Sequence, residues 1–234
     1  MKVEIWSDVV CPWCYIGKRR FETALARFAH RDEVQVTWRS FELDPNARPS
    51  VDDATYAERL GRKYGKSSGE AQQMLDSMTS TAADEGLDFH FEKAVHVNTF
   101  AAHQLIHLGA TAGVQDAVKE RLMRAYFTEG ADVSDAATLI RLGGEAGLAA
   151  QDVQAALTDA RYADAVRADE SDATAIGISG VPFFVIDRTY GVSGAQSPET
   201  LLGVLQKAWA DAHPMTLVSA GPDGDSCGPE GCSV

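Results

Sequence analysis

Residues 7–17, with the sequence SDVVCPWCYIG, decide the fold: two cysteines, Cys11 and Cys14, flank a proline and a tryptophan. The residues before them, 3–10, are mostly apolar and β-prone, and the apolar residues after them recur with the 3.6-residue period of a helix. Proline suits the first turn of a helix, because its missing N–H would have no partner there. The cysteine pair is therefore predicted to lie where a strand leads into a helix.

A second β-prone segment follows at residues 34–43, rich in Val, Trp and Phe. Strand, helix and strand within about 40 residues form a βαβ unit, whose two strands run parallel. The pattern is helical over about residues 51–175, after which the β signal returns at 181–187 with a hairpin partner at 190–193. Ser-Pro-Glu at 197–199 predicts a last helix, with serine as N-cap and proline at its first position.

These patterns predict an α/β protein with one large insertion. Residues 1–48 and 176–213 form the α/β domain, residues 49–175 form a helical subdomain, and residues 214–234 form a flexible tail. Within the insertion, the apolar stripe of residues 118–127 is interpreted as core packing, and Gly130 is its expected C-cap. Four further helices are predicted at about 68–84, 98–112, 135–146 and 161–176.

The composition of the chain limits the classes of partner that it can bind and indicates its cellular compartment. The chain of 234 residues is 45% hydrophobic and 24% charged, as in ordinary globular proteins. A net charge of -13 argues against nucleic acid or an anionic membrane surface as partner, and no apolar run approaches the ~18 residues of a membrane span. The N-terminal residues lack a signal-peptide pattern, so a cytoplasmic protein is expected. Four cysteines in a reducing compartment indicate catalysis or metal binding.

Cys11 and Cys14 have the spacing that thiol–disulfide exchange needs. The exchange requires a thiolate that attacks and a second thiol that resolves the mixed disulfide. Cys11 is expected at the helix N-terminus, where free N–H groups and the helix dipole favour negative charge, so its pKa should fall below the usual value of about 8.5. Cys14, one turn later on the same face, is expected to be less exposed and to act as the resolving thiol.

Gly180-Val181-Pro182 is the second candidate element of the site. A proline that opens a strand donates no hydrogen bond at its own position, and this strand end can lie opposite the cysteines. A cis Val181–Pro182 bond would leave the Val181 backbone free to pair with an extended substrate. The alternative is a strand-edge proline in the commoner trans state.

Together, residues 7–17 and 180–184 (GVPFF) resemble the DsbA family of thioredoxin-fold oxidoreductases. More narrowly, they resemble its cytoplasmic FrnE-like branch, which is related to the 2-hydroxychromene-2-carboxylate isomerases. The resemblance covers residues 1 to about 209. It implies a DsbA-like thioredoxin fold interrupted by a large all-helical insertion. The function implied is that of a protein disulfide oxidoreductase or isomerase without a cofactor.

The resemblance also implies roles for individual residues. Cys11 would be the nucleophile and Cys14 the resolving thiol, Pro12 and Trp13 would shape the motif, and Val181 with cis-Pro182 would form a substrate ledge. Implied partners are disulfide- or thiol-containing proteins, or small thiols such as glutathione. Periplasmic relatives usually carry histidine where this chain has Trp13, so a less oxidising couple is expected.

Cys227 and Cys232 form a second pair near the end of the chain, with glycines and a proline between them that suit a tight turn. A loose tail of ~13 residues has a reach of about 20 Å, which could bring this pair to Cys11. Members of the FrnE-like branch can carry such a second pair. The hypothesis is a relay between Cys227/Cys232 and Cys11/Cys14, and the alternative is a dispensable tail.

Other functions stay open beside dithiol exchange. A zinc site of four cysteines is disfavoured, because the two pairs lie at opposite ends of the chain. His103 and His107 have the i,i+4 spacing of metal ligands, but packing or hydrogen bonding is favoured, and no metal is predicted. A glutathione-dependent isomerase or transferase and a chaperone-like binder remain alternatives. The oligomeric state is left open, with a homodimer among the options.

Overall fold

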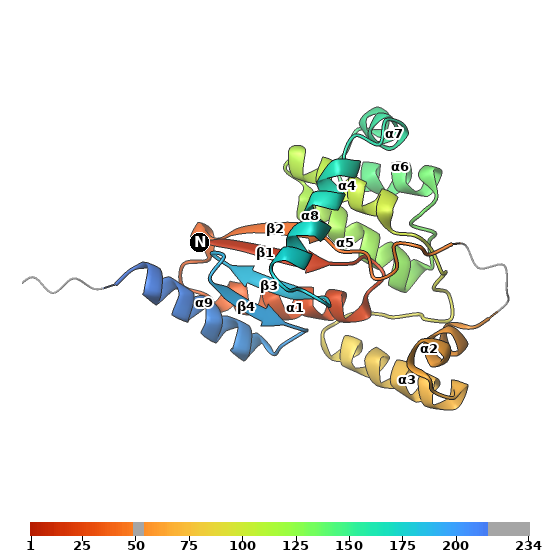
Figure 1. The fold of residues 1–234 in the computed structure, drawn as a ribbon, viewed down its shortest axis with the longest axis horizontal. Coiled ribbons are helices and arrows are strands. Elements are labelled where there is room, and N and C mark those ends of the chain that lie inside the picture. The colour runs from red at the N-terminus through yellow and green to blue at the C-terminus, as the bar shows by residue number, and fades with distance from the viewer. Residues whose placement is uncertain (49–53, 215–234) are drawn as a thin grey trace, which may run out of the picture.

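A four-stranded mixed sheet forms the centre of the protein in a computed structural model that describes residues 1–48 and 54–214 (Figure 1). The strand order is β2-β1-β3-β4; β1 and β2 are parallel, and β3 is antiparallel to both of its neighbours. The strands are β1 (Lys2–Ser7), β2 (Gln35–Ser40), β3 (Phe183–Ile186) and β4 (Tyr190–Ser193). The predicted parallel pair and the predicted hairpin are both confirmed.

Two helices cover one face of the sheet. Helix α1 (Pro12–Arg27) connects β1 to β2 by way of the short 3-10 turn η1 (Arg31–Glu33), and α9 (Pro198–Ala212) packs beside α1. The ring of Phe21 on α1 stacks on Phe184 of β3, with 5.6 Å between centroids. Strand, helix and strand therefore form the expected βαβ unit, closed by a last helix that starts at the predicted serine cap.

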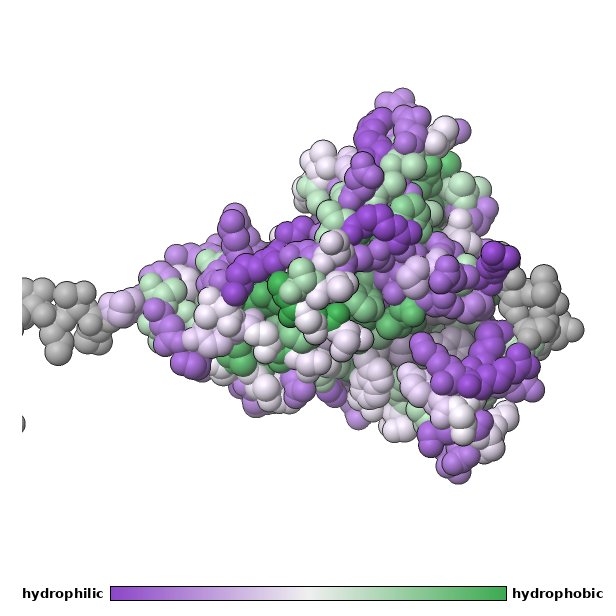
Figure 2. All heavy atoms as spheres, in the orientation of Figure 1, coloured by the Kyte–Doolittle hydropathy of each residue, from purple (hydrophilic) through white to green (hydrophobic). Residues whose placement is uncertain are grey.

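Helix α8 (Ala163–Ala175) covers part of the other face (Figure 1). Trp6 of β1 is fully buried beneath it and donates its indole N–H to the Asp169 carbonyl at 2.9 Å. Figure 2 shows apolar surface beside α8, over β3 and β4, where Val181 and Phe183 are only half-buried. Part of this face of the sheet is therefore open to solvent.

Between β2 and β3 the described chain is helical, as predicted. The apolar stripe of residues 118–127 is buried in the core, and Gly130 ends it with a φ of 70°. The helices are α2 (Tyr56–Tyr64), α3 (Ser68–Asp84), α4 (Phe100–Thr111), α5 (Gln115–Arg124), the π-helical turn η2 (Ala125–Glu129), α6 (Ala136–Glu145), α7 (Ala150–Thr158) and α8. Among these described helices, none combines the length and the hydrophobicity that crossing a membrane requires.

Helices α2 and α7 were not predicted individually. Each has nine residues, too few for the apolar period to stand out from the surrounding helical pattern. Helix α2 does carry a local start signal, a capping box formed by Thr55 and Glu58. The fold as a whole is a thioredoxin fold of the DsbA-like type with its helical insertion, as expected.

An aromatic cluster joins the insertion to the start of α1. The Tyr15 ring lies 5.9 Å from that of Phe89, which in turn lies 4.5 Å from Phe127 of η2. The helices of the insertion therefore pack directly on the first turns of α1, where the cysteines lie.

Candidate active site

Cys11 and Cys14 lie at the N-terminal end of α1. Cys11 is the N-cap, Pro12 is the first helical residue, and the Cys14 N–H donates to the Cys11 carbonyl at 3.0 Å. Both side chains are buried thiols. The predicted strand-to-helix position is confirmed, and the two sulfurs are close enough for a hydrogen bond between the thiols.

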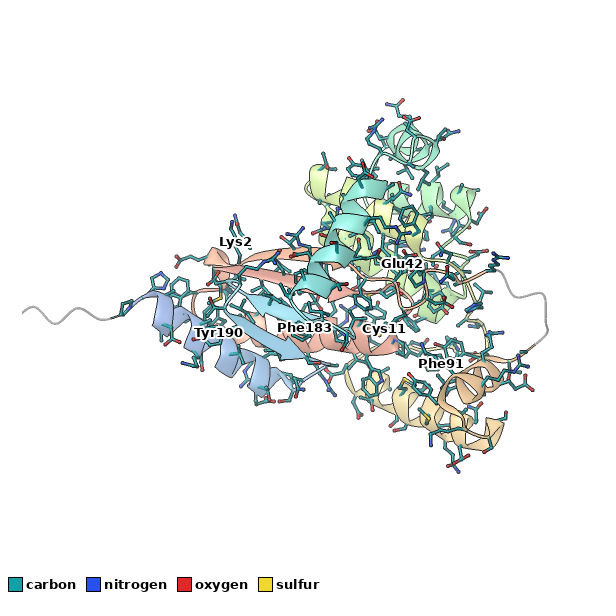
Figure 3. All side chains as sticks on the ribbon, in the orientation of Figure 1. Lys2, Cys11, Glu42, Phe91, Phe183 and Tyr190 are labelled. Atoms are coloured by element: carbon teal, nitrogen blue, oxygen red, sulfur yellow. The ribbon has the colours of Figure 1, made fainter. Side chains whose placement is uncertain are left out.

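The cis Val181–Pro182 bond lies opposite Cys11, as the family resemblance implied. The Cys11 thiol donates to the Val181 carbonyl, with 3.7 Å between Sγ and oxygen. Figure 3 shows Cys11 next to the end of β3 from which Phe183 comes. Gly17 permits this approach, because a Cβ at that position would lie 2.9 Å from Cγ of Pro182. Gly17 was quoted in the motif, but its role depends on a contact that sequence alone does not show.

The acidity predicted for Cys11 is wrong in this geometry. The hydrogen bond with the Cys14 thiol and burial of the sulfur raise the pKa of Cys11 well above its usual value. The N–H of Cys14 at the helix N-terminus lowers this pKa, but by less. Only 4% of the Cys11 side chain is exposed, so the thiolate loses more solvation than the helix N-terminus replaces.

Trp13, unlike the two cysteines, reaches solvent, with 42% of its surface exposed. It lies at a cavity of about 420 Å³ whose wall includes Met74 and Met78 of α3. An exposed indole beside flexible methionine side chains offers an adaptable apolar surface. A substrate bound at Cys11 would find this surface directly beside the reacting sulfur.

Asp8 is a buried carboxylate three residues before Cys11 that the sequence analysis did not single out. Its oxygens accept from the Leu43 N–H at 2.8 Å and pair with Nε2 of His103 at 3.3 Å. Burial by itself would raise the pKa of Asp8, but the hydrogen bond and charge of His103 outweigh it and lower the pKa. The site therefore contains a fixed negative charge that further opposes ionisation of Cys11.

A cavity of about 500 Å³, a size typical of small-molecule sites, is lined by Asp8 and Val10 of the loop that leads to Cys11. Its wall nearest Cys11 contains Asp8, Val10 and Tyr56. The basic side chains around it are those of Arg59, Arg62, Lys63 and His96. Asp8 and Asp44 also line the cavity, so its arginine and lysine side chains outnumber its carboxylates by one, which in a chain of net charge -13 modestly favours an anionic ligand.

Both histidines of the predicted i,i+4 pair have hydrogen-bonding partners. His103 pairs with Asp8, and Nε2 of His107 lies 3.1 Å from Oγ of Ser40 and 3.0 Å from Oδ2 of Asp169. The favoured hydrogen-bonding interpretation is confirmed for both. Within residues 1–48 and 54–214, no group of three or more potential metal ligands comes together.

The second cysteine pair, Cys227 and Cys232, lies outside the described residues. The relay between the two pairs therefore stays a hypothesis from sequence.

Residues 2–206 match the family model of the DSBA-like thioredoxin domain. A probable DsbA oxidoreductase from Streptomyces coelicolor is 46% identical, with a TM-score of 0.85 over 100% of this chain and 99% of that one.

Two more distant structures share the fold. The cytosolic disulfide reductase DsbM from Pseudomonas aeruginosa, solved with GSH, is 18% identical, with a TM-score of 0.63 over 89% of this chain and 99% of that chain. A 2-hydroxychromene-2-carboxylate isomerase is 13% identical, with a TM-score of 0.60 over 91% and 98% of the two chains. At these identities the likeness concerns the fold alone.

Proposed function

Because this chain belongs to the family of DSBA-like thioredoxin domains, we propose that it is a thiol–disulfide oxidoreductase acting through Cys11 and Cys14. One observation carries the proposal. The Cys11 sulfur lies at the start of α1 within hydrogen-bonding reach of both the Cys14 thiol and the Val181 carbonyl. A nucleophile, a resolving group and a backbone acceptor for an extended substrate thus meet at one point.

The exchange runs in two steps with a disulfide substrate. The Cys11 thiolate attacks one substrate sulfur, a mixed disulfide forms, and the other substrate sulfur leaves as a thiolate. Cys14 then loses its proton and attacks the Cys11 sulfur, which forms the Cys11–Cys14 disulfide and releases the second substrate thiolate. The substrate is reduced and the enzyme oxidised, and the same steps in reverse oxidise a dithiol substrate.

Burial of the Cys11 and Cys14 thiols favours activity as a reductase. Strong oxidants of this family owe their potential to a stabilised thiolate in the reduced enzyme. Here the Cys14 hydrogen bond and burial raise the pKa of Cys11, so the reduced state gains little from ionisation. This supports the less oxidising couple expected from Trp13 in place of histidine.

The cavity lined by Asp8 and Val10 supports a small anionic thiol, such as glutathione, as one partner. Glutathione carries two carboxylates, which Lys63 and the other basic groups of the cavity can attract. DsbM, which shares the fold, was solved with GSH. Disulfides of proteins remain a second substrate class, for which the exposed Trp13 offers an apolar contact.

Trapping with Cys14→Ser tests the proposed function. This variant should hold mixed disulfides on Cys11, because the group that releases them is absent. With Cys227→Ser and Cys232→Ser added to both variants, mass spectrometry after exposure to oxidised glutathione should find one glutathione adduct on Cys11, which dithiothreitol removes. Cys11→Ser is the matched control and should carry no adduct on Cys14, which is 1% exposed. Equal adducts on both variants would contradict the assigned roles.

A glutathione-dependent isomerase is the second candidate, and the observation that favours it is the same cavity of about 500 Å³. Isomerisation needs glutathione bound beside a small substrate but no resolving thiol. An isomerase activity that survives Cys14→Ser, without reduction of insulin by the wild type, would reverse the ranking.

A further inference from the structure

Lys119 of α5 is fully buried, although lysine is among the residues least often found inside proteins. Its ammonium group donates to the backbone carbonyl of Ser7 at 3.2 Å. Within the described ranges 1–48 and 54–214, Lys119 makes no salt bridge. A buried ammonium without a carboxylate partner costs several kcal/mol, so stability alone gives no reason for it.

The position of Lys119 relates it to the cysteines. Ser7 is the last residue of β1, and in Figure 1 helix α5 lies beside the end of β1 that leads into α1. The charges of Cys14, Asp8 and Cys11 favour the protonated form of Lys119 and raise its pKa, whereas the charge of Lys18 lowers it. Other charged or titratable groups around this point include His103, which pairs with Asp8, and Asp116, Glu120 and Glu22, which pair with Lys18. Arg19 also pairs with Glu22 and Glu120, and the buried Tyr56 and Tyr126 lie near Asp8.

Lys119 can change its charge near neutral pH. Burial lowers the pKa of its ammonium from 10.5 to about 8, and the nearby Cys14, Asp8 and Cys11 only partly oppose this. A group with a pKa close to the working pH both accepts and returns protons readily. Lys18 differs, because its three carboxylate partners raise its pKa despite burial.

Cys14 needs such a group. Its side chain is 1% exposed, so bulk water does not reach its sulfur while α1 and α5 stay packed. Yet Cys14 has to lose a proton each time it attacks Cys11, and regain one each time the Cys11–Cys14 disulfide is opened. Asp8 is a poor acceptor, because it is held ionised by His103 and its pKa is lowered.

We propose that Lys119 is the proton-transfer residue of Cys14, which rests on the proposed dithiol exchange. In the resolving step the Cys14 proton passes to the neutral Lys119 amine, the Cys14–Cys11 bond forms, and the bond from Cys11 to the substrate sulfur breaks. In the reverse direction the Lys119 ammonium protonates the Cys14 sulfur as it leaves. The helical insertion thus supplies a residue to the chemistry of the thioredoxin-like part.

The resolving step can be measured separately with 5,5′-dithiobis(2-nitrobenzoate). In a background with Cys227→Ser and Cys232→Ser, which keeps the tail thiols out of the reaction, the first thionitrobenzoate is released when Cys11 forms the mixed disulfide, and the second when Cys14 resolves it. In the wild type the rate of the second release should rise with pH and level off above about pH 8. Lys119→Met should slow this release about 100-fold at pH 7, the lower end for a positioned acid–base group, and move the plateau to higher pH.

Three further variants separate proton transfer from charge and from packing. Lys119→Arg keeps the charge but does not deprotonate, so it should behave like Lys119→Met. Lys119→Gln repeats the loss with a polar side chain, in case methionine disturbs the packing. Lys18→Met removes the other buried lysine, whose charge lowers the pKa of Lys119, so it should move the plateau to higher pH but leave the rate on the plateau unchanged.

Two results would overturn the proposal. One is a pH profile of the second release that Lys119→Met and Lys119→Gln leave unchanged. The other is full rescue by Lys119→Arg, which would reduce Lys119 to a fixed charge. Failure of the wild type to release any second thionitrobenzoate is a different result, because it removes the dithiol exchange itself.

Discussion

Two buried lysines approach the same tryptophan ring from two helices, and their surroundings differ. Lys18 of α1 and Lys119 of α5 are 1% and 0% exposed, and their ammonium groups lie 5.9 Å and 5.6 Å from the centre of the Trp38 ring. Lys18 pairs with Glu22, and with Asp116 and Glu120 at 3.2 Å and 3.1 Å. For Lys119, the only hydrogen-bond acceptor that the described residues provide is the Ser7 carbonyl.

The difference shows that burial alone does not say what a charged residue does. Burial lowers the pKa of both lysines, but three carboxylates reverse the direction at Lys18, so that lysine stays charged and holds α1 to α5. At Lys119 burial prevails and lowers the pKa to about 8. The lysine with three carboxylate partners is structural, and the other binds the Ser7 carbonyl at the end of β1 that leads into α1.

Lys18→Met should have the largest effect on stability, because it leaves three carboxylates without their shared cation. We expect the free energy of unfolding at pH 7 to fall by about 3 kcal/mol, the low end for a broken buried pair, because the carboxylates are partly exposed. Urea denaturation of the reduced protein measures this. Glu22→Gln, which leaves Lys18 two partners, is the control and should cost about 1 kcal/mol or less. An unchanged unfolding midpoint for Lys18→Met would contradict the structural role of this lysine.

Lys119→Met should change stability in the opposite direction. We expect its free energy of unfolding at pH 7 to rise by about 2 kcal/mol, because the substitution removes a buried charge without a carboxylate partner. In the folded chain Lys119 loses its proton at about pH 8, whereas in the unfolded chain it keeps it to about 10.5. Between these values the unfolded state binds more protons, so wild-type stability rises with pH. The variant should therefore exceed the wild type in free energy of unfolding by the whole amount below pH 8, and this difference should shrink towards pH 10.5.

Denaturant titrations of both chains at pH 7 and at pH 10 measure this change, and taking the difference between the chains cancels the other titrating groups. A destabilised Lys119→Met chain at pH 7 would mean that the buried ammonium has a compensating partner.

Ser7→Ala should have the smallest effect of the three substitutions. Ser7 is fully buried, and its hydroxyl has no hydrogen-bond partner in the described chain. Replacing it with alanine should raise the free energy of unfolding by about 1 kcal/mol, because a polar group without a partner is removed. Lys119 binds the backbone carbonyl of this residue, so the pH profile of the resolving step should stay unchanged. A shifted profile would place the hydroxyl in the path of the proton.

Much of the fold could be predicted because its signals are local. The 3.6-residue period after Cys14, the proline at position 12 and the Ser197 cap depend on neighbours within one or two turns. The bounds of α3, Ser68–Asp84, agree with the predicted helix. The short helices α2 and α7 were hidden, because nine residues carry too little of the apolar period.

The site was predictable in its residues but not in its electrostatics. The cysteines, the cis bond before Pro182 and the position at the helix start agree with expectation. The acidity of Cys11 does not, because burial and the Cys14 thiol act through packing that sequence periodicity does not contain. A signal for Lys119 was present: a lysine within the apolar stripe of residues 118–127, which was interpreted as core alone.

The sequence by itself determined the motif, the helix that starts at it and the family, because each depends on spacing along the chain. Only the tertiary structure decided which charges lose water and which keep a partner. Lys119 and Ser7 are 112 residues apart, and their contact exists because α5 packs against the end of β1. The solvation of an ion and its distance to a counter-charge are properties of that packing, and they decide whether a buried lysine holds the fold or exchanges a proton.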